Sequence, residues 1–185
     1  MSIETEIKIR TDDIDAFCRL LDALKPQVVS GRHFEDNYLL DFPDRRLENG
    51  RRLLRIRFAE KRVILTYKGP PDPEGIFKKR EELETAVGDG PTALRMLERI
   101  GMAVGFRYQK YRREFMLEGV HVAVDETPIG NYVEMEGSEE GIRAVAEKLR
   151  VSEAQFIRAS YYSLYLDYCR GKNRHPVNMV FGHDG

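Results

Sequence analysis

Charged and apolar residues alternate along seven separate stretches of this chain. In the first stretch Glu4, Glu6 and Lys8 occupy every second position, with Ile7 and Ile9 on the alternate positions. Successive side chains of a β-strand point to opposite faces, so this pattern predicts a strand with one charged and one apolar face. The same alternation recurs at residues 53–58, 65–68, 80–84, 110–114, 121–125 and 134–136. The repetition predicts a sheet whose charged face is large enough to hold all of these side chains.

Turn-forming residues divide the chain into eight predicted strands and four predicted helices. The strands are expected at residues 3–10, 28–41, 51–59, 62–69, 78–87, 106–117, 120–127 and 131–137, and the helices at 12–24, 91–100, 138–150 and 152–169. Most connections between strands are short, which is typical of antiparallel pairing. Residues 171–185 have no periodicity, so they predict a flexible C-terminal tail after a single domain at residues 1–170.

These elements indicate an α+β protein whose sheet closes into an eight-stranded antiparallel β-barrel. Alternating charge in one antiparallel strand usually marks a face that meets water. Here the apolar faces match the apolar stripes of the helices, so we expect the helices outside the barrel and the charged faces inside it. A lumen lined by charges is unfavourable unless opposite charges or bound ions compensate them. The pattern therefore predicts a polar tunnel, with helices packed outside and a C-terminal helix.

Composition narrows the classes of function. The chain of 185 residues carries a formal net charge of -1 although 33% of its residues are charged, so there is no basic field that would favour nucleic acid. It has no apolar run of the length of a signal sequence or membrane span, and we expect a cytoplasmic protein without a membrane partner. Cys18 and Cys169 lie far apart and are expected to be reduced structural thiols. His33 and His121 are expected to form hydrogen bonds rather than act as bases.

The acids and the bases expected inside the barrel come from different strands. Clustered carboxylates are typical of a site for a hard cation such as Mg²⁺ or Mn²⁺. Inward-facing Arg and Lys fit an extended phosphate chain, because Arg binds phosphate through two nitrogens and Lys binds it as a point charge. The expected metal ligands are Glu4, Glu6, Asp125, Glu134 and Glu136, and the expected phosphate-binding residues are Lys8, Arg55, Arg57, Lys68, Arg80, Lys110 and Arg112. Together they predict a tunnel that binds a polyphosphate with its metal ion.

An ordered series of short motifs resembles the CYTH, or triphosphate tunnel metalloenzyme, superfamily over nearly the whole chain. The ExExK motif at residues 4–8 is followed by LRIR at 54–57, LTYKGP at 65–70, REELE at 80–84, KYR at 110–112, VDETPIG at 124–130 and VEMEG at 133–137. The resemblance implies an eight-stranded tunnel and metal-dependent work on triphosphates. It also implies catalytic roles for Glu4, Glu6, Lys8, Lys68 and Arg112. Phe42 departs from the superfamily, whose members often have a small residue in this turn, and we expect it to alter packing at the rim of the tunnel.

Other charged residues on the same faces have less specific expected roles. Glu82, Glu84 and Glu114 are expected to pair with Arg80 and Lys110. On the last helix the resemblance suggests a plug near one mouth of the tunnel, formed by Arg158, Ser160 and Tyr161. The alternative for this helix is an aromatic packing face made by Phe156, Tyr161, Leu164, Tyr165 and Tyr168.

Three functions are compatible with these residues. The first is metal-dependent hydrolysis of inorganic triphosphate, thiamine triphosphate or a nucleoside triphosphate. The second is the reaction of a class IV adenylyl cyclase, which converts ATP to cyclic AMP and pyrophosphate. The cyclase branch tends to carry a short aromatic and basic lead before its first strand, whereas three residues precede Glu4 here, so we expect hydrolysis. The third is a non-catalytic polyphosphate or nucleotide-binding module. A monomer or a homodimer is expected in each case.

Overall fold

The structure is a computed structural model that describes residues 2–60 and 62–182. Met1, Lys61 in the turn expected near residue 60, and residues 183–185 of the expected flexible tail lie outside the described residues. The strands are β1 (Ser2–Thr11), β2 (Gln27–Asp41), β3 (Leu53–Ala59), β4 (Arg62–Lys68), β5 (Lys78–Val87), β6 (Ala103–Leu117), β7 (Val120–Thr127) and β8 (Gly130–Glu136). The helices are α1 (Ile14–Ala23), α2 (Arg46–Asn49), α3 (Gly90–Arg99), α4 (Glu139–Lys148) and α5 (Tyr161–Gly171), with a short 3-10 helix at Glu153–Gln155. The eight expected strands are confirmed, with ends shifted by a few residues.

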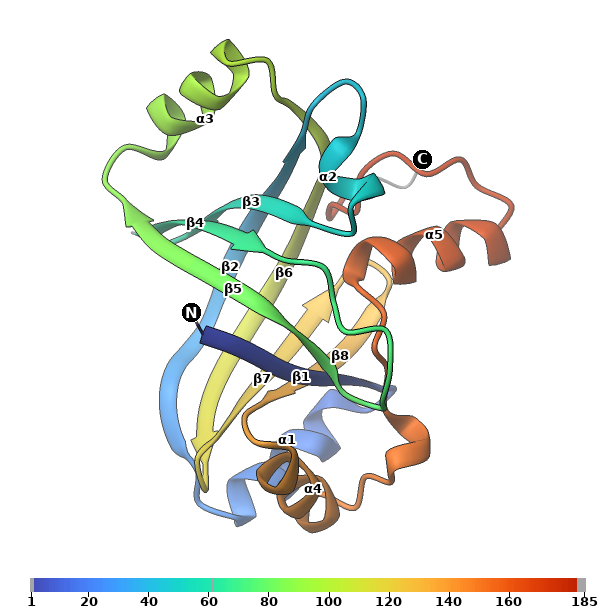
Figure 1. Cartoon of the computed structure of the whole chain (residues 1–185). Coiled ribbons are helices and arrows are strands. Elements are labelled where there is room, and N and C mark those ends of the chain that lie inside the picture. The colour runs from blue at the N-terminus through green and yellow to red at the C-terminus, as the bar shows by residue number, and fades with distance from the viewer. Residues whose placement is uncertain (1, 61, 183–185) are drawn as a thin grey trace.

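The strands form one closed antiparallel barrel in the order β1-β5-β4-β3-β2-β6-β7-β8 (Figure 1). β1 closes the barrel, because it pairs with β5 on one side and with β8 on the other. In the β1–β8 register Glu6 lies opposite Glu136 and Lys8 lies opposite Glu134, so these charged residues share one face. The expected α+β fold with a closed eight-stranded barrel is therefore confirmed.

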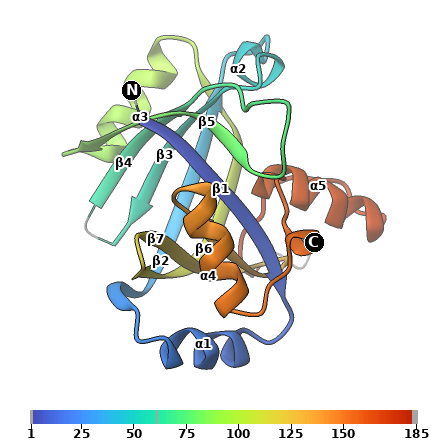
Figure 2. The same ribbon diagram turned by 60° about the horizontal axis from the view of Figure 1, so that its bottom comes forward.

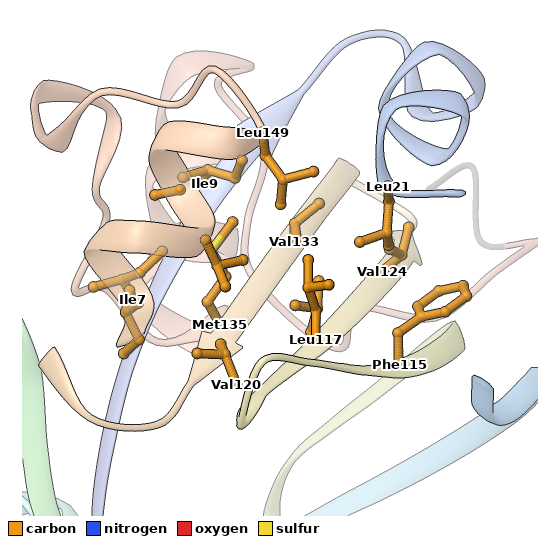
Figure 3. Close-up of a cluster of buried hydrophobic side chains, with 14 of the residues drawn as sticks. Ile7, Ile9, Leu21, Phe115, Leu117, Val120, Val124, Val133, Met135 and Leu149 are labelled. Atoms are coloured by element: carbon orange, nitrogen blue, oxygen red, sulfur yellow. The ribbon is translucent and has the colours of Figure 1, made fainter. Parts of the chain in front are cut away.

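The largest apolar core lies on the outside of the barrel wall, where α1 and α4 cover β1, β7 and β8 (Figure 2). Ile7 and Val133 point outward from their strands and are fully buried in this core with Leu21 of α1 (Figure 3). Burying one such side chain contributes roughly 1.5–3 kcal/mol. α1 begins where the Asp13 carboxylate accepts a hydrogen bond from the backbone N–H of Ala16 at 2.8 Å. Because the helices take the apolar faces, the charged faces are left to the lumen.

The expected helix at residues 152–169 is wrong in its first half. The 3-10 helix is followed by extended chain until Ser160 caps α5. β5 pairs with β1 only as far as Glu6, which leaves the backbone of Lys8 available on that side. Ile157 takes this edge and exchanges two backbone hydrogen bonds with Lys8, at 3.0 and 2.7 Å. Pairing with β1 therefore replaces helical turns that the sequence pattern favoured.

The segment after α5 is held against the barrel at Met179. Its backbone N–H donates to the carbonyl of Arg107 at 3.0 Å, and its carbonyl accepts from the N–H of Gln109 at 2.8 Å. The Met179 side chain is buried in a cluster with Phe106 and Tyr108. The expectation of a flexible tail is therefore wrong for this part of the chain, because a single anchoring residue leaves no periodic signal in the sequence.

The two cysteines have the expected structural character. Cys18 and Cys169 are both buried and free. Burial raises the pKa of the Cys18 thiol, which keeps it in the unreactive neutral form. Among the described residues, no helix has both the length and the apolar character needed to cross a membrane.

Candidate active site

A cavity of about 740 Å³ opens into the barrel beneath α2 and α5, which stand at the same end of the molecule (Figure 1). Its rim carries apolar side chains, among them Leu39, Phe42, Leu54, Phe106 and Tyr162, together with charged ones: Asp41, Arg45, Glu48, Arg51, Arg52 and Arg158. Phe42 thus lies at the rim, where the sequence places it. The inner wall is charged, and we call it the cavity region: Glu6, Lys8, Arg55, Lys68, Lys78, Arg80, Lys110 and Glu134.

The lumen continues beyond the residues that line the cavity. The strand registers place a second set of charged residues there, which we call the acidic region: Glu4, His33, Glu35, Arg57, Glu82, Glu84, Arg112, Glu114, His121, Asp125 and Glu136. Cations predominate in the cavity region and carboxylates in the acidic region. The predicted metal ligands and phosphate-binding residues therefore all reach the lumen, but they divide unequally between its two parts.

Glu6 is the centre of the cavity region. Its carboxylate lies 2.8 Å from Lys78 Nζ, 3.4 Å from Lys8 Nζ and 3.8 Å from a terminal nitrogen of Arg80. Burial disfavours the ionised carboxylate, but the charges of Lys8 and Lys78 outweigh it and hold the pKa of Glu6 well below its ordinary value. Lys8 also lies 3.3 Å from Glu134. Both acids of the cavity region are therefore ionised and neutralised by several cations.

Lys68 joins the two regions. Its Nζ lies 2.6 Å from Glu4 Oε1 and 2.9 Å from Glu82 Oε2. The other oxygen of Glu4 accepts from Arg80 Nε at 3.2 Å. Lys68 is only 6% exposed, so its position depends on these carboxylates. A phosphate entering the cavity region would meet an ammonium group that is already oriented.

Arg55 and Arg57 enter the lumen from β3 and keep part of their hydrogen-bonding capacity unused. Arg55 donates to the Tyr108 hydroxyl at 3.1 Å and to Thr66 Oγ1 at 3.2 Å. Arg57 lies 3.4 Å from Glu35. Among the described residues, nothing accepts a hydrogen bond from the buried Nε of either arginine. An unpaired buried N–H is costly, so both guanidinium groups favour an added anion.

Carboxylates crowd together in the acidic region around Glu4. Burial, opposed by Lys68 and reinforced by the charge of Glu4, raises the pKa of Glu82 to about 7. Burial and then the charge of Glu4 also raise the pKa of Glu136, although this residue reaches solvent at the end of β8. Burial is the larger cause of both shifts, and the charge of Glu4 adds to it. A bound cation would favour the ionised form of both carboxyl groups.

Asp125 is engaged by several donors from different elements. Arg112 donates to both of its oxygens at 2.7 Å, Lys110 donates at 3.0 Å and the Tyr161 hydroxyl donates at 2.6 Å. Arg112 also donates to Glu134 at 2.6 Å. Asp125 is fully buried, so this network fixes the positions of Lys110, Arg112 and Tyr161. The first residue of α5 thus reaches into the lumen.

The donor set fits a divalent cation best where Glu4, Glu6 and Glu136 approach one another. Their oxygens are the ligands that Mg²⁺ and Mn²⁺ prefer, and burial together with the charge of Glu4 raises the pKa of Glu136, which a bound cation would offset. Asp125 fits less well, because its oxygens already accept hydrogen bonds from Lys110, Arg112 and Tyr161. Among the described residues, no three acidic, histidine or cysteine side chains are grouped as a preformed metal site. A cation would therefore have to displace ammonium or guanidinium groups from the carboxylates.

The expected pairing needs correction for two of the three lumen acids. Glu84 pairs with Arg55 and Arg57 at 3.4 and 3.5 Å rather than with Arg80. Glu114 lies 3.0 Å from His121 and 3.7 Å from His33, and not against Lys110. The partners of Glu82 include Lys68. Arg55 and Arg57 reach Glu84 across β4, which lies between β3 and β5 in the barrel, so alternation along each strand does not disclose this contact.

His33 and His121 have the hydrogen-bonding roles that the sequence predicts. His33 Nδ1 lies 2.9 Å from the carbonyl of Gly31, and its Nε2 lies 3.6 Å from Glu35. His121 Nε2 lies against Glu114.

The expected aromatic packing face of the last helix is present, and the three residues of the expected plug lie at the cavity, while the plug itself stays a prediction. Tyr161 points into the lumen, and Arg158 and Ser160 line the cavity near its mouth. Tyr165 packs against Phe106 with ring centroids 5.6 Å apart. The remaining residues of the expected aromatic face also pack in apolar clusters: Phe156, Leu164 and Tyr168.

Sequence reasoning missed two buried charges and one buried amide in the lumen. Lys78 is 6% exposed and shares the inner face of β5 with Arg80, so extending the alternation back by one step would have found it. Glu35 is 2% exposed and lies 3.6 Å from Lys110. Asn37 is fully buried, and neither its amide nitrogen nor its amide oxygen has a hydrogen-bond partner among the described residues. The register of β2 is regular from His33 to Leu39, but Glu35, Asp36 and Asn37 are consecutive polar residues, so the sequence does not show which of them face the lumen.

The tunnel, its charge distribution and its motif series agree with one known family. The CYTH domain matches residues 2–161 of the chain. The chain belongs to the CYTH domain family. A protein of Methanocaldococcus jannaschii named "putative adenylate cyclase" is 27% identical to this CYTH domain over 173 residues, which cover 88% of this chain and 98% of that protein.

Solved structures share the fold of this CYTH domain. A "putative adenylate cyclase" from Vibrio parahaemolyticus superposes with a TM-score of 0.77 at 23% identity, covering 88% of this chain and 97% of that chain. A protein of Hippeastrum, described as a "putative adenylyl cyclase" that "reveals a dominant triphosphatase activity", has a TM-score of 0.64 at 19% identity, covering 95% of this chain and 98% of that chain. These similarities extend over nearly the whole length of each protein. CYTH enzymes of the triphosphate tunnel type use divalent metals.

Proposed function

We propose that this CYTH domain is a divalent-metal-dependent triphosphatase, which removes the terminal phosphoryl group of a triphosphate held inside the barrel. The observation that carries the proposal is the unequal division of charge along the lumen. A basic wall faces a cavity of about 740 Å³, and a set of carboxylates lies directly beyond it. A triphosphate needs cations along its length and a metal site at the phosphorus that reacts.

The residues would share the work by position. Lys8, Arg55, Lys68, Arg80 and Lys110 would bind the phosphate oxygens in the cavity region, because all five line it. Glu4, Glu6, Glu134 and Glu136 would hold Mg²⁺ or Mn²⁺. When bound, the cation supplies charge neutralisation and activates water for attack. Asp125 would act mainly through Arg112 and Lys110, by keeping their charged groups in place.

The two ends of the tunnel differ in polarity, and this difference indicates how a bound triphosphate would be oriented. The apolar side chains of the rim, among them Phe106 and Tyr162, suit an organic group attached to the triphosphate. The terminal phosphate would then point toward the acidic region. Water attacking from that side is in line with the departing diphosphate, as phosphoryl transfer requires. The Hippeastrum protein, whose reported dominant activity is that of a triphosphatase, supports hydrolysis as the reaction.

A second candidate is the adenylyl cyclase reaction. It is favoured by the names of the similar proteins from M. jannaschii and V. parahaemolyticus and by the aromatic rim, on which an adenine ring could stack. The same cations would bind the phosphates, but the α-phosphate would have to lie beside the metal.

One product analysis separates the two reactions. Purified protein is incubated with ATP and Mg²⁺ or Mn²⁺, and nucleotides and phosphates are resolved by chromatography. ADP with orthophosphate is the expected result. Cyclic AMP with pyrophosphate would replace the triphosphatase by the cyclase. The same assay with inorganic triphosphate and thiamine triphosphate ranks the substrates by kcat/KM.

A binding module without turnover is the third possibility. It would bind triphosphate in a calorimeter, lose that binding in Arg57→Ala or Lys110→Ala, and give no product under any metal or pH condition. Carboxylates beside an anion site repel the anion unless a cation lies between them. The carboxylates of the acidic region therefore support a bound metal ion, and a bound metal ion favours catalysis over binding alone. Measured turnover that is lost in the same two variants would eliminate the binding module.

A further inference from the structure

Lys78 is a buried lumen residue for which the phosphate-binding role has yet to be considered. It is the first residue of β5, lies opposite Glu6 in the β1–β5 register and lines the cavity with Lys8 and Arg80. Its ammonium group is 2.8 Å from Glu6 Oε1. Among the described residues, Glu6 is the only ion-pair partner of Lys78.

Glu6 is shared by more cations than one carboxylate needs. Lys78, Lys8 and Arg80 all lie within 3.8 Å of it. Lys8 has a further partner in Glu134, and Arg80 has one in Glu4. Lys78 depends on Glu6 alone for its compensation.

The Glu6 carboxylate cannot at the same time be the counterion of Lys78 and a ligand of a divalent cation. A cation that takes the Glu6 carboxylate leaves the Lys78 ammonium buried without its counterion. A buried unpaired charge is strongly unfavourable, so the ammonium would gain from any anion that reaches the cavity.

We propose that Lys78 is a further phosphate-binding residue of the tunnel, which Glu6 holds until a divalent cation takes the Glu6 carboxylate. The inference rests on the proposed triphosphate site, but not on which reaction follows. Under it, metal and triphosphate reinforce each other through a change of partner at Lys78. By thermodynamic linkage the effect is reciprocal, so triphosphate also strengthens metal binding.

The neighbouring Lys79 is a matched control. It points out of the barrel and pairs with Glu139 at the start of α4. Lys78→Met and Lys79→Met therefore make the same chemical change one residue apart, inside and outside the tunnel. Thermal unfolding of both variants checks that the barrel is intact.

The test measures binding, without turnover. Imidotriphosphate, whose bridging nitrogens resist hydrolysis, is titrated into each protein in a calorimeter with and without Mn²⁺, and Mn²⁺ is also titrated alone. With Mn²⁺ present, Lys78→Met should weaken imidotriphosphate binding by roughly ten- to hundredfold, the effect of one charge-assisted hydrogen bond. Mn²⁺ alone should bind Lys78→Met several-fold more tightly, because Glu6 has lost a competing cation. Lys79→Met should match the unaltered protein in both titrations.

A second variant changes Glu6, the other member of the Lys78–Glu6 pair. Glu6→Gln releases Lys78 without metal, so imidotriphosphate should bind it about tenfold more tightly than the unaltered protein when Mn²⁺ is absent. This arm decides the matter if Lys78→Met does not fold. Unchanged binding in Lys78→Met, or weaker metal-free binding in Glu6→Gln, would show that Lys78 only balances Glu6 and would overturn the proposal. If both shifts appear in a protein that turns over no triphosphate, the inference on Lys78 stands and the proposed hydrolysis fails.

Discussion

The cavity region and the acidic region of the lumen differ in how far neighbouring cations compensate their buried carboxylates. In the cavity region each carboxylate is surrounded by cations, and the pKa of Glu6 is held well below its ordinary value. In the acidic region carboxylates outnumber the cations beside them, and the pKa of Glu82 is raised to about 7. The first region therefore attracts an anion, and the second attracts a cation. A metal-bound triphosphate is the kind of ligand that satisfies both.

The comparison of the two regions also distinguishes charged residues that are available to a ligand from charged residues that stabilise the barrel wall. Arg112 lies in the acidic region, yet it holds Asp125 and Glu134 through charge-assisted hydrogen bonds and is only 6% exposed. Part of the charge inside the barrel thus stabilises the wall itself, and part remains available for a ligand. Substitutions that affect one part and spare the other distinguish the two.

The largest effect is expected from the acids that would hold the metal. Glu4→Gln and Glu136→Gln keep the shape of the side chain but remove its charge, so turnover of triphosphate should fall by roughly a thousandfold or more while the barrel still folds. Steady-state assays with excess Mn²⁺ measure the loss. Glu81→Gln, on the same strand as Glu82 but of opposite parity, should keep its activity. Full activity in both lumen variants would remove the metal assignment from the acidic region.

Arg112→Ala should have the largest effect on stability. It would leave Asp125 and Glu134 buried with less compensation, and breaking a buried pair costs about 3–5 kcal/mol. Urea unfolding followed by circular dichroism gives the free energy of unfolding. Arg113→Ala is the control, because Arg113 lies on the outer face, 3.8 Å from Glu126, where an ion pair contributes about 1 kcal/mol at most. Equal losses in the two variants would contradict the assignment of Arg112 to a structural network.

Tyr161→Phe should have a smaller effect on stability, and it tests whether α5 supports the wall of the lumen. It removes the 2.6 Å hydrogen bond to Asp125, which we expect to cost about 1–2 kcal/mol of unfolding free energy. Tyr168→Phe, in the apolar cluster under the same helix, is the comparison and should cost less. If Tyr161→Phe instead left stability unchanged and raised kcat, the hydroxyl would obstruct the lumen rather than support it.

The smallest expected effect concerns pH and the acidic region. The carboxylate of Glu35 beside it raises the pKa of His33 above its ordinary value. A group whose folded pKa is raised stabilises the protein fully below its unfolded pKa, near 6.5, and this contribution is lost as pH rises through the folded pKa. His33→Asn should therefore lose stability relative to the unaltered protein at pH 5.5, and the difference should shrink by pH 8. The exposed His175→Asn should show no such trend when unfolding is measured across this range.

The fold was largely predictable from residue order, because its signals are local. The alternation at Glu4, Glu6 and Lys8 predicts a strand and its two faces, and the apolar spacing that predicts helices at residues 12–24 and 138–150 coincides with α1 and α4. The last helix is the exception. Its first half is extended because Ile157 pairs with Lys8, a residue distant in sequence whose backbone edge becomes available only in the closed barrel.

Although Lys78 and Glu35 were missed, the sequence identified most of the charges that enter the lumen, since period-two alternation assigns a side chain to a face before any strand has a partner. It did not determine which charges meet. Lys68 with Glu4, Glu6 with Lys78, and the bonds of Asp125 to Tyr161 join residues from strands and a helix far apart along the chain. Those contacts depend on the order of the strands around the barrel and on the position of α5, so they form only in the folded chain. The charge available to a ligand is what remains after these pairs have formed, and for that reason the division into a cavity region and an acidic region appears only in the folded protein.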